Sequence, residues 1–255
     1  MQSNIYKKAI DDFIVLGGKI PKLDNLILRG TCIDQKDLIE GWSDLDFSIV
    51  VRKLDYENIP EIKKLVQYLK RSNNFKISVT VVTSSDFNSP YHYHGMKPIY
   101  YSHEVKNDNN YINPGLLKIP MCFLENILLY DCITNLVYLI HDLRSQYFSC
   151  GDSSREVIIF TRHIIKRSKF ILKNAFFVMS QEISKDINIS NFTQYFPQVT
   201  SDFLETINNS KYYWEDIIKD QQRIQKIMSH AFEQVNYIYE TTLVQLSNNE
   251  NQEVT

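Results

Sequence analysis

The stretch from Asn25 to Val51 constrains the fold more than any other part of the chain. Its sequence is NLILRGTCIDQKDLIEGWSDLDFSIVV. An apolar run, 26–28, is followed by Gly30-Thr31, where a glycine lets the backbone turn sharply and approach a ligand closely. A second apolar run, 47–51, begins directly after two aspartates. The pattern predicts two strands, joined by a turn and by a short helix over 37–41.

Two carboxylates open the second of these strands. Residues two apart in a strand share a face, so we expect Asp44 and Asp46 to project together while Leu45 and Phe47 enter the core. Two like charges at that spacing repel each other unless a cation lies between them. Mg²⁺ is usually held by one or two carboxylates together with substrate phosphates. We therefore interpret Asp44 and Asp46 as metal ligands; the alternative is a pair of solvated carboxylates at a sheet edge.

This arrangement resembles the nucleotidyltransferase superfamily, which includes the antibiotic (aminoglycoside and lincosamide) nucleotidyltransferases and DNA polymerase β. The family motif is an apolar residue, Gly, then Gly or Ser, followed about a dozen residues later by Asp-x-Asp or Asp-x-Glu on a strand. Gly30-Thr31 corresponds to the first part, with Thr in place of the usual Ser. Asp44-Leu45-Asp46 corresponds to the second part, and Ser43 before it is also common in the family. The resemblance covers about 27 residues.

The third strand departs from the family pattern. Residues 75–82 (FKISVTVV) alternate and predict a strand, where the family usually carries a third carboxylate. Ser78 or Thr80 occupies the corresponding position, and Asp86 lies just beyond the strand. The general base that deprotonates the hydroxyl receiving the nucleotide must then come from elsewhere, or the site is degenerate.

The rest of the N-terminal half fits an α/β domain. Apolar periodicity predicts helices over 4–16 and 59–71 around the three strands. Together these elements predict an N-terminal nucleotidyltransferase domain, a small mixed sheet flanked by helices, spanning 1–115. Asn, Asp, Pro and Gly over 107–115 predict a linker at its end.

The C-terminal half is predicted to be an all-α helical bundle over 116–246. Helices are expected over 121–147, where apolar residues occur nearly all round, and over 152–181. A long final helix is expected over 213–246, after shorter helices over 191–195 and 199–208. The polar tail 247–255 is predicted to be disordered.

Two features of this bundle are candidates for function. Asp131 interrupts an apolar helix surface, so it either faces an active-site cleft or bonds to a neighbouring helix. Arg162, Lys166, Lys169 and Lys173 form one stripe at spacings of four, three and four, opposite an apolar face. The stripe is either a solvated basic face or, as the family layout implies, a set of cations that neutralises the triphosphate, with Arg162, Lys166 and Lys169 as our choices.

A weaker pattern lies in the final helix. Arg223 and His230 are separated by six residues, which loosely resembles the signature of HEPN-type ribonucleases. Ile224 stands where that signature usually has a polar residue. RNA cleavage by the helical half is therefore a third interpretation.

Composition limits the classes of partner. The chain of 255 residues has 44% apolar residues and a formal net charge of −2, which predicts a globular protein without a global basic field for long nucleic acids. A signal peptide and an apolar run of membrane-span length are both missing from the sequence, so we expect no membrane association and a cytoplasmic location. A homodimer remains an open alternative.

The resemblance implies a Mg²⁺-dependent transferase that binds ATP or another NTP and moves NMP, with AMP expected, onto a hydroxyl of a small antibiotic-like acceptor, as in antibiotic resistance. Asp44 and Asp46 would be catalytic metal ligands and Asp131 the catalytic base. Gly30, Thr31, Ser43, Arg162, Lys166 and Lys169 would bind the nucleotide. The alternatives are a degenerate nucleotide-sensing or protein-binding module, or a transferase acting on a protein or on tRNA.

Overall fold

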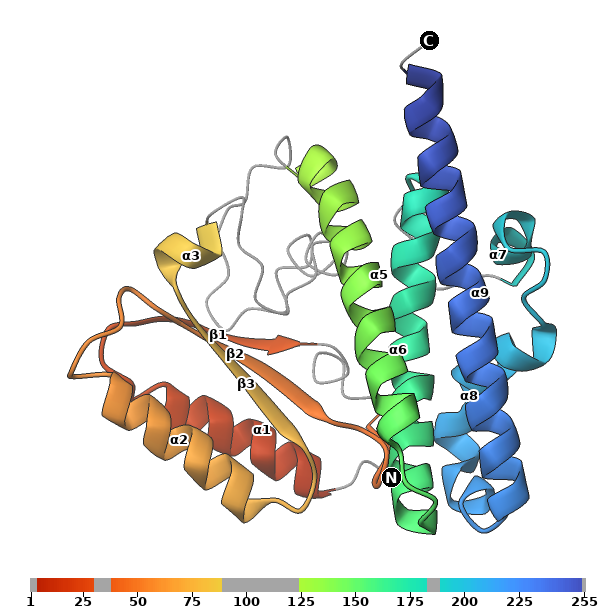
Figure 1. Cartoon of the computed structure of the whole chain (residues 1–255). Coiled ribbons are helices and arrows are strands. Elements are labelled where there is room, and N and C mark those ends of the chain that lie inside the picture. The colour runs from red at the N-terminus through yellow and green to blue at the C-terminus, as the bar shows by residue number, and fades with distance from the viewer. Residues whose placement is uncertain (1–3, 30–37, 89–123, 183–188, 254–255) are drawn as a thin grey trace. The chain divides into compact units, whose positions relative to one another are not determined.

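The computed structural model describes residues 4–29, 38–88, 124–182 and 189–253 (Figure 1). The chain divides into two compact units, Met1–Ile127 and Leu128–Thr255, and each is described by itself. The expected domain boundary and the 107–115 linker lie outside the described residues.

The N-terminal unit combines three strands with helices. Its elements in chain order are α1 (Asn4–Gly17), β1 (Leu23–Arg29), β2 (Leu45–Val51), α2 (Ile59–Ser72), β3 (Ile77–Thr83) and α3 (Ser84–Asn88). The helices and strands predicted from apolar periodicity are confirmed, with ends that shift by a few residues. α2 begins as expected, with Pro60 in its first turn.

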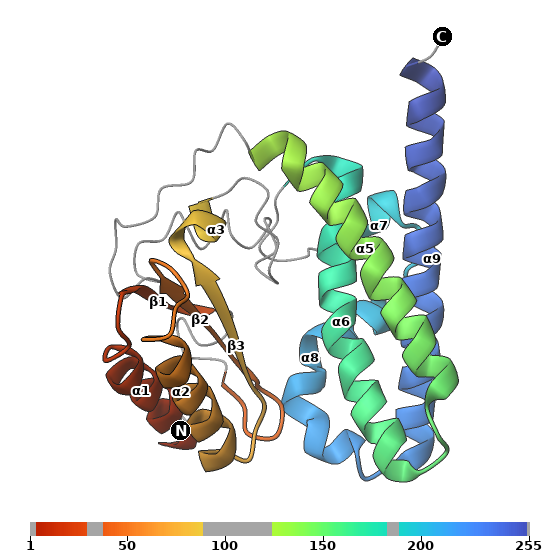
Figure 2. The ribbon, with the colours of Figure 1, turned by 60° about the vertical axis from the view of Figure 1, so that its left-hand side comes forward.

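The three strands form one mixed sheet in the order β1-β2-β3. β1 pairs with β2 antiparallel and β3 pairs with β2 parallel, so α2 is the crossover between the two parallel strands. α1 and α2 lie side by side on one face of the sheet (Figures 1 and 2). The small mixed sheet flanked by helices is therefore confirmed.

Alternation along β2 explains why the helices cover this face. Leu45 and Phe47 are fully buried in the core between the sheet and the helices, as predicted. Phe13 of α1 stacks on Phe47 with ring centroids 4.1 Å apart. The same core takes Leu26 from β1, Leu69 from α2 and their apolar neighbours. Burial of these side chains fixes which face each β2 residue presents.

The C-terminal unit consists of helices in the part of it that the structure describes. They are α5 (Leu124–Ser149), whose first residues belong to the first unit, α6 (Ser154–Ser180), α7 (Ile189–Tyr195), α8 (Ser201–Ile217) and α9 (Gln221–Glu253). Apolar residues from all of these helices share one core. α6 begins at the N-cap Ser153, whose hydroxyl accepts from the Glu156 amide. The predicted all-α character of this half is confirmed.

The long final helix predicted over 213–246 is two helices. α8 continues to Ile217, and α9 starts after Asp220. The Asp220 carboxylate accepts from the amide of Arg223 at 3.0 Å, which satisfies a free N–H of the first turn and allows a new helix to begin there. Apolar residues continue at helical spacing across the break, so apolar periodicity alone did not show it.

Two further differences concern the last residues of α9 and the surface of α5. α9 runs to Glu253 and projects past the other helices of its unit (Figure 1), whereas the polar tail from 247 was predicted to be disordered. Residues 247–253 contain neither Gly nor Pro, so nothing in them stops a helix that is already formed.

Apolar residues occur nearly all round α5, but the helix is not enclosed on all sides, because Tyr130, Tyr138 and Phe148 are each more than 60% exposed.

Among the helices of the described residues, none is both long enough and apolar enough to cross a bilayer.

Candidate functional site

A buried tyrosine shapes the loop that leads into the two aspartates. The Tyr6 hydroxyl of α1 donates to the carbonyl oxygens of Ile39 and Ser43 at 3.0 and 3.1 Å. The Ile39 amide in turn donates to Ser43 Oγ at 2.8 Å. These contacts close a tight loop directly before Asp44. They join the start of α1 to the start of β2.

Residues 38–41 form part of this loop and its turn, not the short helix expected over 37–41; residue 37 lies outside the described residues. Gly41 adopts a left-handed conformation with φ of 75°, which interrupts a helix and which a side chain would disfavour. Ser43, predicted to bind the nucleotide, is buried and its hydroxyl holds the loop. A nucleotide contact by Ser43 stays a prediction.

Asp44 and Asp46 lie at the start of β2. Asp44 immediately precedes the strand and Asp46 is its second residue. Both are half-buried, while Leu45 between them is fully buried against the helices. Alternation therefore places Asp46 on the face of the sheet away from α1 and α2, while Asp44 stands one residue before the strand begins.

The pairing of the strands sets the neighbours of Asp46. In the antiparallel pair its partner is Arg29, the last residue of β1. In the parallel pair its partner is Ser78 of β3. Gly30 and Thr31 lie outside the described residues, but they directly follow Arg29 in the chain. The strand that leads into the Gly-Thr motif thus ends beside the second aspartate.

This register also shows which residues of β3 stand where the family resemblance leads us to expect a third carboxylate. Ser78 is the residue of β3 level with Asp46, and Thr80 is level with Ser48. Asp86 lies past the other end of β3, where its carboxylate accepts from the amide and hydroxyl of Thr83. Ser78 and Thr83 are five residues apart, or about 16 Å along a strand. Asp86 therefore does not replace the absent acid.

The two aspartates fit a Mg²⁺ ion that is shared with a substrate. Within the described residues, no group of three or more His, Cys, Asp or Glu side chains lies close enough to hold an ion by itself. Mg²⁺ bound to a nucleotide needs only one or two protein carboxylates, because phosphate oxygens and water complete its shell. Asp44 and Asp46 supply hard oxygen ligands of that kind and number.

Asp131 is a half-buried carboxylate on α5 of the C-terminal unit. Burial raises its pKa above the ordinary aspartate value. Its carboxylate makes no hydrogen bond or ion pair with any described residue, so the expected alternative of a bond to a neighbouring helix is not found among them. A raised pKa suits a proton acceptor, and the catalytic role of Asp131 stays a prediction.

The basic stripe of α6 is not a fully solvated face. Arg162, Lys166, Lys169 and Lys173 are each half-buried, and Nε of Arg162 is enclosed. The opposite side of the helix carries Phe160, Ile164 and Ile171 into the core, as predicted. The stripe belongs to the C-terminal unit, and its contact with a nucleotide stays a prediction.

His230 has a structural partner. Its Nε2 lies 2.9 Å from Thr200 Oγ1, and Thr200 is the N-cap of α8. Arg223 is exposed two turns earlier on α9. The hydrogen bond gives His230 a role in joining α8 to α9, and RNA cleavage by this pair has no further support in the described residues.

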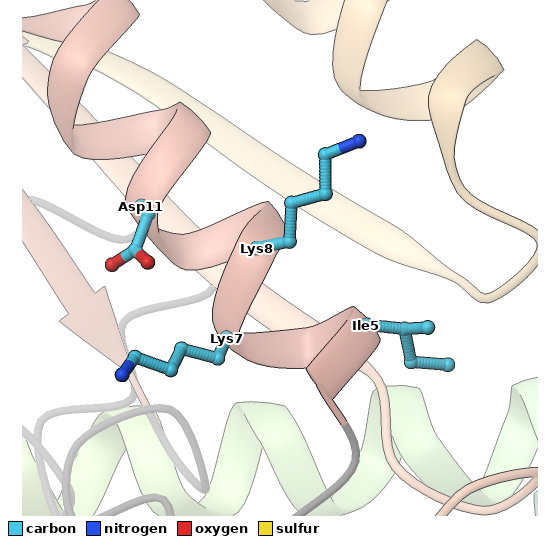
Figure 3. A pocket seen from close by; sticks show the side chains of 4 residues that line it. All are labelled: Ile5, Lys7, Lys8 and Asp11. Atoms are coloured by element: carbon cyan, nitrogen blue, oxygen red, sulfur yellow. The ribbon is translucent and has the colours of Figure 1, made fainter.

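A hollow of about 500 Å³ lies against α1, where Ile5, Lys7, Lys8 and Asp11 line it (Figure 3). None of the predicted site residues that the structure describes is in this lining. Lys7 and Asp11 point to one side of the helix and Lys8 to another, so the charges do not converge on one ligand group (Figure 3).

Sequence reasoning missed two residues of the site. Tyr6 was assigned only to a helix whose apolar face enters the core. Arg29 was not considered, because the register that brings it to Asp46 cannot be read from the strand alone. Comparison with known proteins adds no further residue: no family model matches the chain, and no curated protein matches it.

Proposed function

We propose that the chain is a Mg²⁺-dependent nucleotidyltransferase that moves the NMP group of an NTP, with ATP the expected donor, onto a hydroxyl. The observation that carries this proposal is the register of β1 against β2. It brings the end of β1, directly before Gly30-Thr31, level with Asp46 on the sheet face opposite the helices. A phosphate-binding turn and a pair of metal ligands are required side by side in such a site.

The residues of the N-terminal unit have distinct tasks in this proposal. Asp44 and Asp46 hold Mg²⁺ against the triphosphate, where the ion, when bound, draws charge from the phosphate oxygens and orients them. The backbone amides at Gly30-Thr31 bind phosphate oxygens, since a glycine permits close approach. Tyr6 and Ser43 keep the loop before Asp44 in place.

The reaction joins the acceptor oxygen to the α-phosphorus and breaks the bond between that phosphorus and the oxygen bridging to the β-phosphate. Pyrophosphate leaves with the electron pair of that bond. The hydroxyl proton passes to a base, for which Asp131 is our candidate. Arg162, Lys166 and Lys169 are assigned to phosphate neutralisation by the family resemblance. The class of acceptor we favour is a small antibiotic-like molecule.

A second candidate is a nucleotide-sensing or protein-binding module. It is favoured by Ser78, which stands level with Asp46 where the family usually has an acid. Such a module binds ATP and releases no pyrophosphate with any acceptor.

Transfer of α-labelled ATP in the presence of Mg²⁺ tests the proposal. The acceptors are a panel of aminoglycosides, lincosamides, tRNA and lysate protein. We expect label on one acceptor class with the wild type, and its loss in Asp44→Asn and Asp46→Asn. Asp11→Asn, an exposed carboxylate on α1, is the matched control. Full activity in either site variant refutes the metal assignment, and binding without transfer selects the sensing module.

A further inference from the structure

A row of polar side chains crosses the sheet on the face away from α1 and α2. It consists of Arg29 from β1, Asp46 from β2 and Ser78 from β3, which are direct partners in the two strand pairs. Side chains of directly opposed residues start about 5 Å apart, within the reach of a guanidinium. Arg29 is therefore a close neighbour of the proposed metal ligand.

One donor of the Arg29 guanidinium is left without an acceptor among the described residues. Its Nε is buried and has no hydrogen-bond partner. The group makes no ion pair or hydrogen bond with any described residue, including Asp46. A buried donor left without an acceptor is unfavourable, and an arginine fork matches two phosphate oxygens at once. The geometry thus leaves an unused donor at the end of β1, level with Asp46.

We propose that Arg29 binds a phosphate of the nucleotide directly, so that a polyphosphate binds this site before a divalent ion does. The identity of the ligand as a nucleotide rests on the proposed function. The need for a cation here follows from charge: Asp44 and Asp46 together carry −2, and an anionic phosphate chain beside them is repelled.

The composition of the row lowers this repulsion. Arg29 brings the formal charge that it shares with Asp44 and Asp46 to −1. An acid at Ser78 would return it to −2. Both the presence of Arg29 and the absence of a third carboxylate therefore favour a phosphate chain in metal-free conditions. Ser78, which weakens the family match, thus reduces the repulsion of a phosphate chain, as Arg29 does.

Binding of inorganic tripolyphosphate and of ATP in EDTA, measured by calorimetry on the full chain, tests this proposal. We expect Arg29→Gln to weaken both by about tenfold, as for loss of a charge-assisted hydrogen bond. Arg29→Lys should fall between, because it keeps the charge and loses the fork. Arg52→Gln is the matched control, since Arg52 is an exposed arginine just after the other end of β2. Adenosine, which lacks phosphate, should not respond to any of these changes.

Asp46→Asn gives a test of opposite sign. In EDTA it should tighten tripolyphosphate binding, because a negative charge beside Arg29 is removed. With Mg²⁺ it should weaken ATP binding, because a metal ligand is lost. Equal binding by wild type and Arg29→Gln, no binding by the wild type in EDTA, or weaker binding by Asp46→Asn in EDTA overturns the inference. Arg29-dependent binding in a protein that transfers no label would leave the inference standing and remove only the proposed reaction.

Discussion

Single residues fix the loop that presents the two aspartates. Tyr6 holds two loop carbonyls from α1, and Ser43 holds a loop amide. Neither role could be read from the sequence, because each depends on contacts between residues more than thirty apart or within an irregular turn. The face taken by Asp46, opposite to that of the buried Leu45 and Phe47, could be read, since it needs only the period of a strand. Arg29 needed the register between strands.

Removing the Tyr6 hydroxyl should loosen this loop. We expect Tyr6→Phe to lower the unfolding free energy by about 1 kcal/mol, because a buried hydrogen bond is lost while the ring stays packed. Metal-dependent ATP binding should weaken with it. Urea unfolding and calorimetry measure the two effects. Tyr68→Phe, which removes a hydroxyl bonded to Asp12 near the surface, is the control. Unchanged ATP binding in Tyr6→Phe would contradict the role given to the loop.

A second residue-scale prediction concerns acid. Hydrogen bonding and charge from Lys22 lower the pKa of Asp55 from 3.8 to about 2. A depressed pKa means that this pair stabilises the fold above the unfolded value and that the contribution disappears as the pH falls from about 4 to about 2.

Asp55→Asn removes the charge and keeps an acceptor for the amides of Glu57 and Asn58. Wild type should therefore be more stable than the variant at pH 6, and the difference should shrink toward zero near pH 2. Thermal unfolding across this range measures it. A difference that does not change with pH would show that Lys22 does not act through charge.

At the scale of elements, apolar periodicity predicted whether a segment is a helix or a strand better than it predicted the residues at which the element begins and ends. The helices that became α1, α2 and α6 and the strands were recognised because each buries one face. The division between α8 and α9 was missed because apolar residues continue across Asp220, and only a capping contact marks the break. Apolar residues occur nearly all round α5, but this composition does not tell which of its tyrosines face solvent.

The break between α8 and α9 can be tested at its cap. Asp220→Ala should cost about 1 kcal/mol, the usual loss for an N-cap carboxylate. Glu215→Ala, an exposed acid on α8, should change stability little. Urea unfolding compares the two variants. Equal stability of both would mean that Asp220 does not define the start of α9.

At the scale of the whole molecule, the described residues form two separate cores. The residues around Phe13 and Phe47 belong to the N-terminal unit, and those around Ile164 and Val235 belong to the C-terminal unit. Among the residues that the structure describes, none belongs to both clusters. The division into an α/β half and a helical half followed from the change in pattern along the sequence, whereas the placement of the basic stripe relative to a nucleotide depends on tertiary contacts that no local pattern encodes.

A cavity in one core should act on its own unit. Ile164→Ala should destabilise the C-terminal unit by about 2–5 kcal/mol, through lost burial and the space left behind. Hydrogen exchange read by peptide should speed up in α6 and α9 and stay unchanged in α1 and β2. Exchange that rises equally in both units would show that they unfold as one body.

The central claim is that Asp44 and Asp46 hold a divalent ion together with nucleotide phosphates. Its most direct test is ATP binding measured by calorimetry with and without Mg²⁺, in wild type, Asp46→Asn and the Asp11→Asn control. Mg²⁺ should tighten ATP binding in the wild type and the control, and this gain should be lost in Asp46→Asn. The same gain from Mg²⁺ in Asp46→Asn as in the wild type would contradict the claim.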